Sequence, residues 1–171
     1  CSATNKVFIY EEPVTDPDIH VDIHVPDKVW QGTTILADNH RRGRPRIIEV
    51  DMRGRIVWEY VLPLNLRQYN NPGFDVELLP SNNVLFVLPG KGIYEINRNG
   101  EVVWSHLDKK VSHDADRIPN GNTLITGTTA LIEITPDKEI VWRLKLKNVH
   151  FRSREQAPAL GFYKSQRTGE K

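Results

Sequence analysis

The sequence has a single cysteine, Cys1, a single methionine, Met52, and no apolar run long enough to cross a membrane as a helix. One cysteine excludes an intramolecular disulfide, so the fold depends on its core. Motifs that would indicate a reaction are also missing: the glycine-rich phosphate loop, the serine nucleophile elbow, CxxC and HExxH. We therefore expect no cofactor.

The composition is that of an ordinary globular protein. Of the 171 residues, 39% are hydrophobic and 26% are charged, which suits one domain with a buried core. Charge is uneven: residues 1–26 hold one basic and five acidic side chains, whereas residues 143–171 hold eight basic and two acidic ones. The basic end lacks the interleaved aromatic residues of a nucleic-acid surface, so we expect no nucleic-acid partner.

The start of the chain indicates a location. Cys1-Ser2, followed by a polar run and without an initiator methionine, is typical of a bacterial lipoprotein cut before its acylated cysteine. This pattern predicts lipidation at Cys1 and an extracytoplasmic place, in the periplasm or at the cell surface, with membrane contact only through the lipid. A fragment that happens to begin at this residue is the competing explanation.

Three segments repeat one another and predict the fold. Each has an apolar strand with a central Glu, a turn, and a second strand ending in Ile/Val-Val-Trp: IIEVDMRGRIVWEY (47–60), IYEINRNGEVVWSH (93–106) and LIEITPDKEIVWRL (131–144). The Asn99-Gly100 turn predicts a two-residue hairpin with positive φ at both positions. Because the three tryptophans recur with the repeat, we expect them to pack between adjacent sheets.

A further strand pair precedes each hairpin. FDVELLP (74–80) and HDADRIP (113–119), with HVPDKVW (24–30) as a looser copy, each lead through a turn into a short apolar strand. Four strands per unit of about 40 residues indicate β-propeller blades. We predict an all-β fold of three to four blades, a partial or small propeller, with an N-terminal segment and edge strand at 1–26, blade repeats at 27–163 and a tail at 164–171.

The alternating pattern from Ile19 to Val25 predicts the edge strand, ended by Pro26. Three blades are few for a closed ring. The ring is completed by the two ends of this chain pairing into a fourth blade, by another chain, or by further sequence of a longer propeller.

Three groups of side chains are candidates for chemistry. In HDAD, alternation along a regular strand puts His113 on one side and Asp114 and Asp116 on the other, so the motif alone does not direct all three at one metal ion. Either His113 lines the central channel as nucleophile or base, or the three residues cap strand ends. His20 and His24 share a face with Asp22, and adjacent members of this set are candidates for one metal ion. The loop after Asn39 is a candidate anion site, through His40, Arg41, Arg42 and Arg44.

The order HDADRIPNGNTLI, then LIEI, a turn and EIVW, resembles the repeats of arylsulfotransferase-like β-propeller proteins, related in architecture to the propellers of pyrroloquinoline-quinone (PQQ) enzymes. The resemblance covers residues 24–163. For the family's six-bladed enzymes it implies sulfuryl transfer between phenols through a sulfohistidine in the channel. It assigns that position to His113, with either Arg117 or the loop from Arg41 to Arg46 neutralising the sulfate oxygens. This chain has Gly127-Thr128 where those enzymes place an Arg-His pair, and Phe74 replaces His113 in the second copy.

These departures favour a non-catalytic binding or assembly module. Its partners are other protein chains that complete the blade stack, or a small anionic or phenolic ligand. Two alternatives remain open at this point: an aryl sulfotransferase with His113 and Arg117 as catalytic residues, and a metal-binding extracytoplasmic lipoprotein using His20 and His24.

Overall fold

The computed structural model describes residues 23–28, 32–38, 43–67, 75–108, 111–127 and 129–145, with the main chain alone at 23–28 and 111–113. All regular structure in these ranges is β-strand. They hold no helix long and apolar enough to cross a membrane. The predicted all-β fold is confirmed.

Twelve strands form three sheets, each of four strands. Sheet 1 contains β1 (Ile23–Lys28), β2 (Thr34–Asp38), β3 (Arg46–Val50) and β4 (Ile56–Val61). Sheet 2 contains β5 (Val76–Leu78), β6 (Val84–Leu88), β7 (Gly92–Ile96) and β8 (Val102–His106). Sheet 3 contains β9 (Val111–Arg117), β10 (Thr123–Gly127), β11 (Ala130–Ile134) and β12 (Ile140–Lys145).

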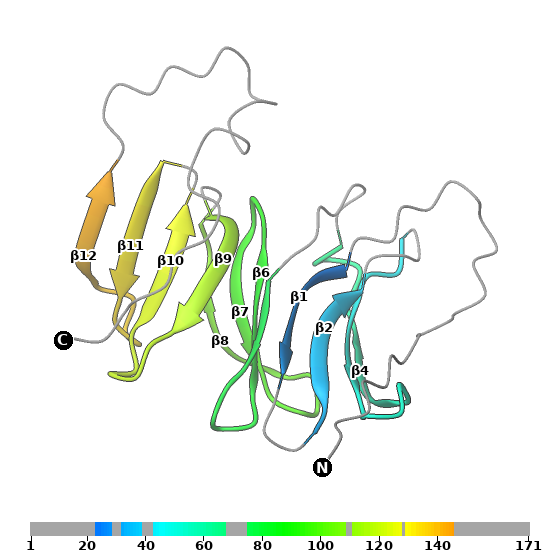
Figure 1. Cartoon of the computed structure of the whole chain (residues 1–171). Helices are drawn as coiled ribbons and strands as arrows, with labels where there is room; N and C mark the ends of the chain where they lie inside the picture. Colours follow the sequence, from blue (N-terminus) through cyan, green and yellow to red (C-terminus); the bar gives the residue numbers. More distant parts are fainter. Residues whose placement is uncertain are drawn as a thin grey trace.

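Each sheet is an antiparallel meander in which every strand pairs with its neighbours in sequence. The sheets follow one another in chain order, with sheet 2 between the other two (Figure 1). This is the four-stranded unit that the repeats predict, and it has the strand order of a propeller blade. The described residues form three such units, and the count of three to four blades stays a prediction.

The hairpin turns share one geometry that differs from the predicted two-residue turn. In sheet 2 the Gly100 N–H donates to the Asn97 carbonyl at 2.9 Å, and the Asn97 N–H donates to the Glu101 carbonyl at 3.0 Å. Gly100 has φ +81°, whereas Asn99 is not in the positive-φ region. The loop is therefore a type I turn closed by one left-handed residue and a bulge, and the ladder shifts register after Glu95.

A lysine takes the left-handed position in the third copy. Lys138 has φ +70°, where the first two copies have Gly54 and Gly100. Its N–H donates to the Thr135 carbonyl at 2.8 Å, so the turn closes as in the other sheets. The turn geometry thus survives a residue that does not favour it.

The first strand continues through Pro26, where the sequence pattern predicts its end. β1 reaches Lys28, and the pairing with β2 shifts register between His24 and Asp27. A proline is accepted here because β1 lies at a sheet edge and within a bulge, so its missing N–H removes no ladder hydrogen bond.

Two cores fill the spaces between the sheets. The first joins sheets 1 and 2 and is built from aliphatic residues of β2, β3 and β6 with Phe86 and Tyr94. The second joins sheets 2 and 3 through Leu85, Val87 and Ile93 on one side and Ala115, Ile125 and Ile132 on the other. Each sheet therefore buries side chains against the sheet that follows it.

Candidate functional site

In sheets 1 and 2, one tryptophan joins the sheet to the turn of the next sheet. The indole N–H of Trp58 on β4 donates to the Arg98 carbonyl at 3.0 Å, and that of Trp104 on β8 donates to the Pro136 carbonyl at 2.9 Å. Both acceptors are the second residue of a hairpin turn. Both indoles are partly buried against the core between their sheets, as predicted from the repeat.

An arginine from the following sheet lies over each of these indoles. The Arg98 guanidinium carbon is 4.4 Å from the Trp58 ring centre, and Nη2 of Arg98 donates to Oε2 of Glu49 on β3. The Arg117 guanidinium carbon is 4.9 Å from the Trp104 ring centre. A cation over an indole face is a favourable contact.

Arg117 pairs with a glutamate as Arg98 does. Its Nη2 donates to Oε2 of Glu95 on β7 at 2.8 Å, and the two side chains are 16% and 13% exposed. Arg98 comes from a hairpin turn, whereas Arg117 ends the innermost strand of its sheet. Two different sequence positions therefore supply the same interaction.

The repeated glutamate is also held within its own sheet. Its Oε1 atom accepts a hydrogen bond from Thr33 Oγ1 at 2.6 Å in sheet 1 and from Asn83 Nδ2 at 2.7 Å in sheet 2. In sheet 3, Oε1 of Glu133 accepts from Nδ2 of Asn122 at 2.7 Å. The central Glu of LIEI-type strands is thus part of the blade scaffold.

Trp142, the third member of the series, differs from the first two. It is 40% exposed, and Leu144 beside it is 46% exposed. The equivalent pairs Trp58 with Tyr60 and Trp104 with His106 are partly buried. Packing between adjacent sheets is therefore correct for two of the three tryptophans, since no described sheet follows sheet 3.

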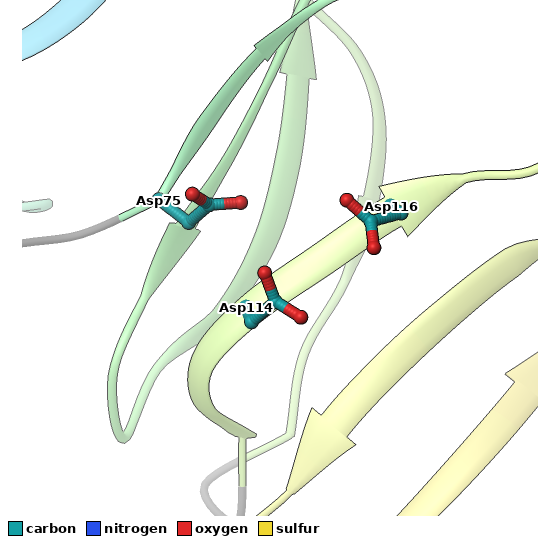
Figure 2. Close-up of side chains that lie close together, drawn as sticks. All are labelled: Asp75, Asp114 and Asp116. Atoms are coloured by element: carbon teal, nitrogen blue, oxygen red, sulfur yellow. The ribbon is translucent and has the colours of Figure 1, made fainter. Parts of the chain in front are cut away.

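Three carboxylates meet at the inner strands of sheets 2 and 3. Asp75 precedes β5, and Asp114 and Asp116 lie on β9; one ligand oxygen from each lies within 4.8 Å of the others. Figure 2 shows the Asp75 side chain extending toward the two carboxylates of β9. Asp114 is buried and accepts a hydrogen bond from Thr126 Oγ1 at 3.1 Å. Carboxylate oxygens are the ligand type that hard divalent cations take.

The sequence motifs did not identify Asp75 as a site residue, although an alignment of two copies of the repeat predicts its position. FDVELLP and HDADRIP are copies of one block, so Asp75 is the counterpart of Asp114, and Glu77 is the counterpart of Asp116. Glu77 reaches the same edge: its Oε2 accepts the Arg117 N–H at 2.9 Å. Acidic residues of the inner strands thus gather where two sheets meet.

The predicted catalytic pair is placed only in part. His113 lies on β9, and its side chain is outside the described part of the structure. Ala115 packs in the core, while the neighbouring Asp114 bonds to Thr126, consistent with the predicted alternation. The Arg117 guanidinium lies at the contact between sheets 2 and 3. A role for either residue in sulfuryl transfer stays a prediction.

The remaining predicted sites fall largely beyond the described ranges. Cys1, His20, His40, Arg41 and Arg42 lie outside them, and His24 is described in its main chain alone. Their roles in lipidation, metal binding and anion binding stay predictions.

Two arginines near the predicted anion site are described. Arg44 is exposed, with Nη2 3.8 Å from Oε1 of Glu59. Arg46 lies inside the sheet, where it pairs with Asp38 at 2.7 Å and with Glu59 at 2.9 Å. Acidic partners from neighbouring strands therefore already surround the second of these cations.

These features define a repeat protein of four-stranded antiparallel sheets packed face to face, in which a tryptophan of each of the first two sheets bonds to a turn of the next. No protein-family profile and no curated protein sequence matches the chain. Among solved structures, it is similar to a protein of unknown function from Bacteroides caccae, with TM-score 0.60 and 17% identity over 72% of this chain. It is also similar to BamB from Moraxella catarrhalis, with TM-score 0.45 and 18% identity over 67% of this chain.

This chain spans about half of the Bacteroides caccae protein, 46%, and 33% of the Moraxella catarrhalis one. At this level of identity, the likeness to the Bacteroides caccae structure is one of fold alone.

Proposed function

We propose that this chain is a non-catalytic binding or assembly module of the β-propeller type, which associates through the outer part of sheet 3. The observation that carries the proposal is the exposure of Trp142, at 40%, in a position whose two counterparts join adjacent sheets. The same residue type in the same place of the repeat favours the same kind of contact.

The surface around Trp142 is apolar. Trp142 and Leu144 are two residues apart and hence on one side of β12; both are large, hydrophobic and exposed, whereas their counterparts in the first two sheets are partly buried. Contiguous exposed apolar side chains on a soluble protein mark interaction surfaces. The patch continues the series of interfaces between sheets 1 and 2 and between sheets 2 and 3.

A second copy of this chain offers the matching surface. The acceptors of Trp58 and Trp104 are carbonyls of Arg98 and Pro136; the equivalent residue of sheet 1 is Met52, which is 54% exposed in a turn of the same geometry. Lys28 holds the register position of Arg117, because it pairs with Thr34 as Arg117 pairs with Thr123. Sheet 1 of one copy therefore supplies a turn carbonyl to sheet 3 of another, and its strand β1 has a lysine at the register position of Arg117.

Sedimentation velocity over a hundredfold range of protein concentration tests this association. We expect a concentration-dependent species heavier than the monomer, weakened by Trp142→Glu. Val103→Glu is the matched control, because Val103 is 51% exposed on β8 and has no place in the proposed contact. A monomer at every concentration, or equal weakening by the two variants, would overturn the proposal.

The non-catalytic part has its own test. With p-nitrophenyl sulfate as donor and phenol as acceptor, we expect no release of p-nitrophenol above the rate without protein. Turnover that is abolished by His113→Ala but retained by His150→Ala, a control change at a histidine outside the HDAD motif, would instead establish an arylsulfotransferase.

A further inference from the structure

An aromatic cluster fills the interface between sheets 1 and 2. The ring centres of Tyr60 and Phe86 are 6.1 Å apart, and those of Phe86 and Tyr94 are 5.6 Å apart. Burial raises the pKa of both tyrosines above its usual value of 10.0. Leu88, at the end of β6, is fully buried in the same core. Large side chains thus occupy the outer part of this interface.

The interface between sheets 2 and 3 has smaller residues at every one of these positions. Phe86 pairs with Tyr94 in the ladder, and Ile125 pairs with Ile132 at the same place in sheet 3. Tyr60 and His106 each lie two residues after the joining tryptophan, and Leu88 and Gly127 each end the second strand of their sheet. Three aromatic rings and a leucine are replaced by a histidine, two isoleucines and a glycine.

The space that these replacements leave is an open cavity of about 470 Å³, lined by His106, Ile125, Gly127 and Ile132 among the described residues. Pockets for small ligands have volumes of about 300–1,000 Å³ and mostly apolar walls. Ile125 and Ile132 form the buried floor of this cavity, and the exposed side chains of Leu107 and Ile140 add apolar wall above them. The cavity therefore has the size and the lining of a site for a small molecule with a flat apolar body.

Charge at the mouth of the cavity selects for an anion. Arg143 and Lys145 line it from β12, two residues apart and hence on one side of the strand, and both are exposed. Among the lining side chains that the structure describes, Asp108 is the one acidic residue. Burial, the largest effect, lowers the pKa of His106 below 6.5. The imidazole is thus neutral at pH 7 and leaves the attraction of an anion to the two cations.

We propose that this inter-sheet cavity binds a small aromatic carboxylate, with the ring against Ile125 and Ile132 and the carboxylate at Arg143 and Lys145. The bound ring takes the place that Phe86 and Tyr94 occupy in the neighbouring interface. The site is lined by strands β8, β10, β11 and β12, whereas His113 lies on β9, at the other edge of sheet 3 from β12. It is independent of the self-association through Trp142.

Binding of 2-naphthoate, measured by isothermal titration calorimetry at pH 7 and low salt, tests the proposal. We expect one saturable site per chain, and about tenfold weaker binding of the uncharged 2-naphthalenemethanol, the effect of losing a charge-assisted hydrogen bond. The absence of saturable binding, or equal affinity for the two compounds, would contradict it.

Two sets of variants test the two parts of the site. Arg143→Gln with Lys145→Gln changes exposed side chains, and we expect about tenfold weaker binding of 2-naphthoate with little change for the alcohol. Arg53→Gln, an exposed arginine of the β3–β4 turn, is the control and should leave binding unchanged. Equal effects of the double variant and the control would overturn the assigned anion position.

The second set transfers the aromatic residues of the first interface into the cavity. Ile125→Phe with Ile132→Tyr should abolish 2-naphthoate binding and raise the Tm, because the new rings fill the space that the ligand uses. Undiminished binding in the folded variant would contradict the proposed ring position. If this variant does not fold, Arg143→Gln with Lys145→Gln still tests whether the cavity binds 2-naphthoate at the proposed anion position.

Discussion

The indole N–H of Trp104 donates to the Pro136 carbonyl at 2.9 Å and so ties the outer strand of sheet 2 to the hairpin turn of sheet 3. Trp58 makes the same contact with Arg98 one sheet earlier. In both interfaces, the tryptophan therefore contributes a hydrogen bond as well as apolar packing.

Replacing Trp104 by Phe should therefore destabilise the protein although an aromatic ring is kept. We expect a loss of about 1 kcal/mol in the free energy of unfolding, the usual net contribution of one hydrogen bond. Urea unfolding followed by circular dichroism measures it. Val103→Ala, at an exposed position of the same strand, is the control and should change the free energy by less than about 0.5 kcal/mol. Equal losses in the two variants would contradict the assigned contact.

The Arg117–Glu95 pair should couple sheets 2 and 3. Both side chains are largely buried, so removing one charge leaves the other without compensation. We expect Arg117→Gln and Glu95→Gln each to cost about 2–3 kcal/mol, below the full cost for a buried pair because some exposure remains. A double-mutant cycle gives the coupling energy. Additive losses would show that the two residues stabilise the fold independently.

Lys138 is a position where a simple change should stabilise the chain. Its φ of +70° costs an ordinary side chain about 1 kcal/mol that glycine avoids, although glycine loses some of this through the entropy of the unfolded chain. We expect Lys138→Gly to raise the Tm by a few degrees in differential scanning calorimetry. Asp137→Gly, one residue earlier and without positive φ, should lower it. A lower Tm in both variants would refute the strain at Lys138.

Stability should decrease as the pH falls below about 6.5, and His106 should account for part of the loss. Burial lowers the pKa of His106 in the folded protein, so the unfolded chain binds its proton first, and each step below the unfolded pKa favours unfolding. The nearby Asp108 raises this pKa, and Lys138 lowers it.

His106→Asn should therefore flatten the dependence of Tm on pH between 8 and 5. Asp108→Asn should steepen it, because it removes the charge that favours the imidazolium. Differential scanning fluorimetry at half-unit pH steps measures both slopes. Unchanged slopes in both variants would exclude His106 as the titrating group.

The repeats predicted the sheets well because blade formation depends on local pattern. Alternating apolar residues, a central Glu and a turn residue recur in every copy, and the strands formed where they occur. The sequence did not predict the left-handed Lys138, since the turn is imposed by the ladder on both sides of it. Nor did it predict the end of β1, because acceptance of Pro26 depends on its place at a sheet edge.

The candidate sites were less predictable because they combine residues of different copies. Asp75 lies near Asp114 and Asp116 only because sheets 2 and 3 pack together. The cavity beside His106 depends on residues of two sheets that are smaller than Tyr60, Phe86 and Tyr94 at the equivalent positions. A single motif such as HDAD contains Asp114 and Asp116 but not Asp75, which lies at the equivalent position of another copy.

Arg98 and Arg117 deliver a guanidinium to equivalent places from a turn in one sheet and from a strand in the next. The repeat therefore keeps the position of the guanidinium at this contact, although the arginine occupies different sequence positions in the two sheets. An interface between two blades can therefore first gain the strand arginine and then lose the turn arginine. Every intermediate on this route keeps an ion pair with the glutamate. Such a route would let the copies of one ancestral blade lose recognisable identity while their interfaces stay intact.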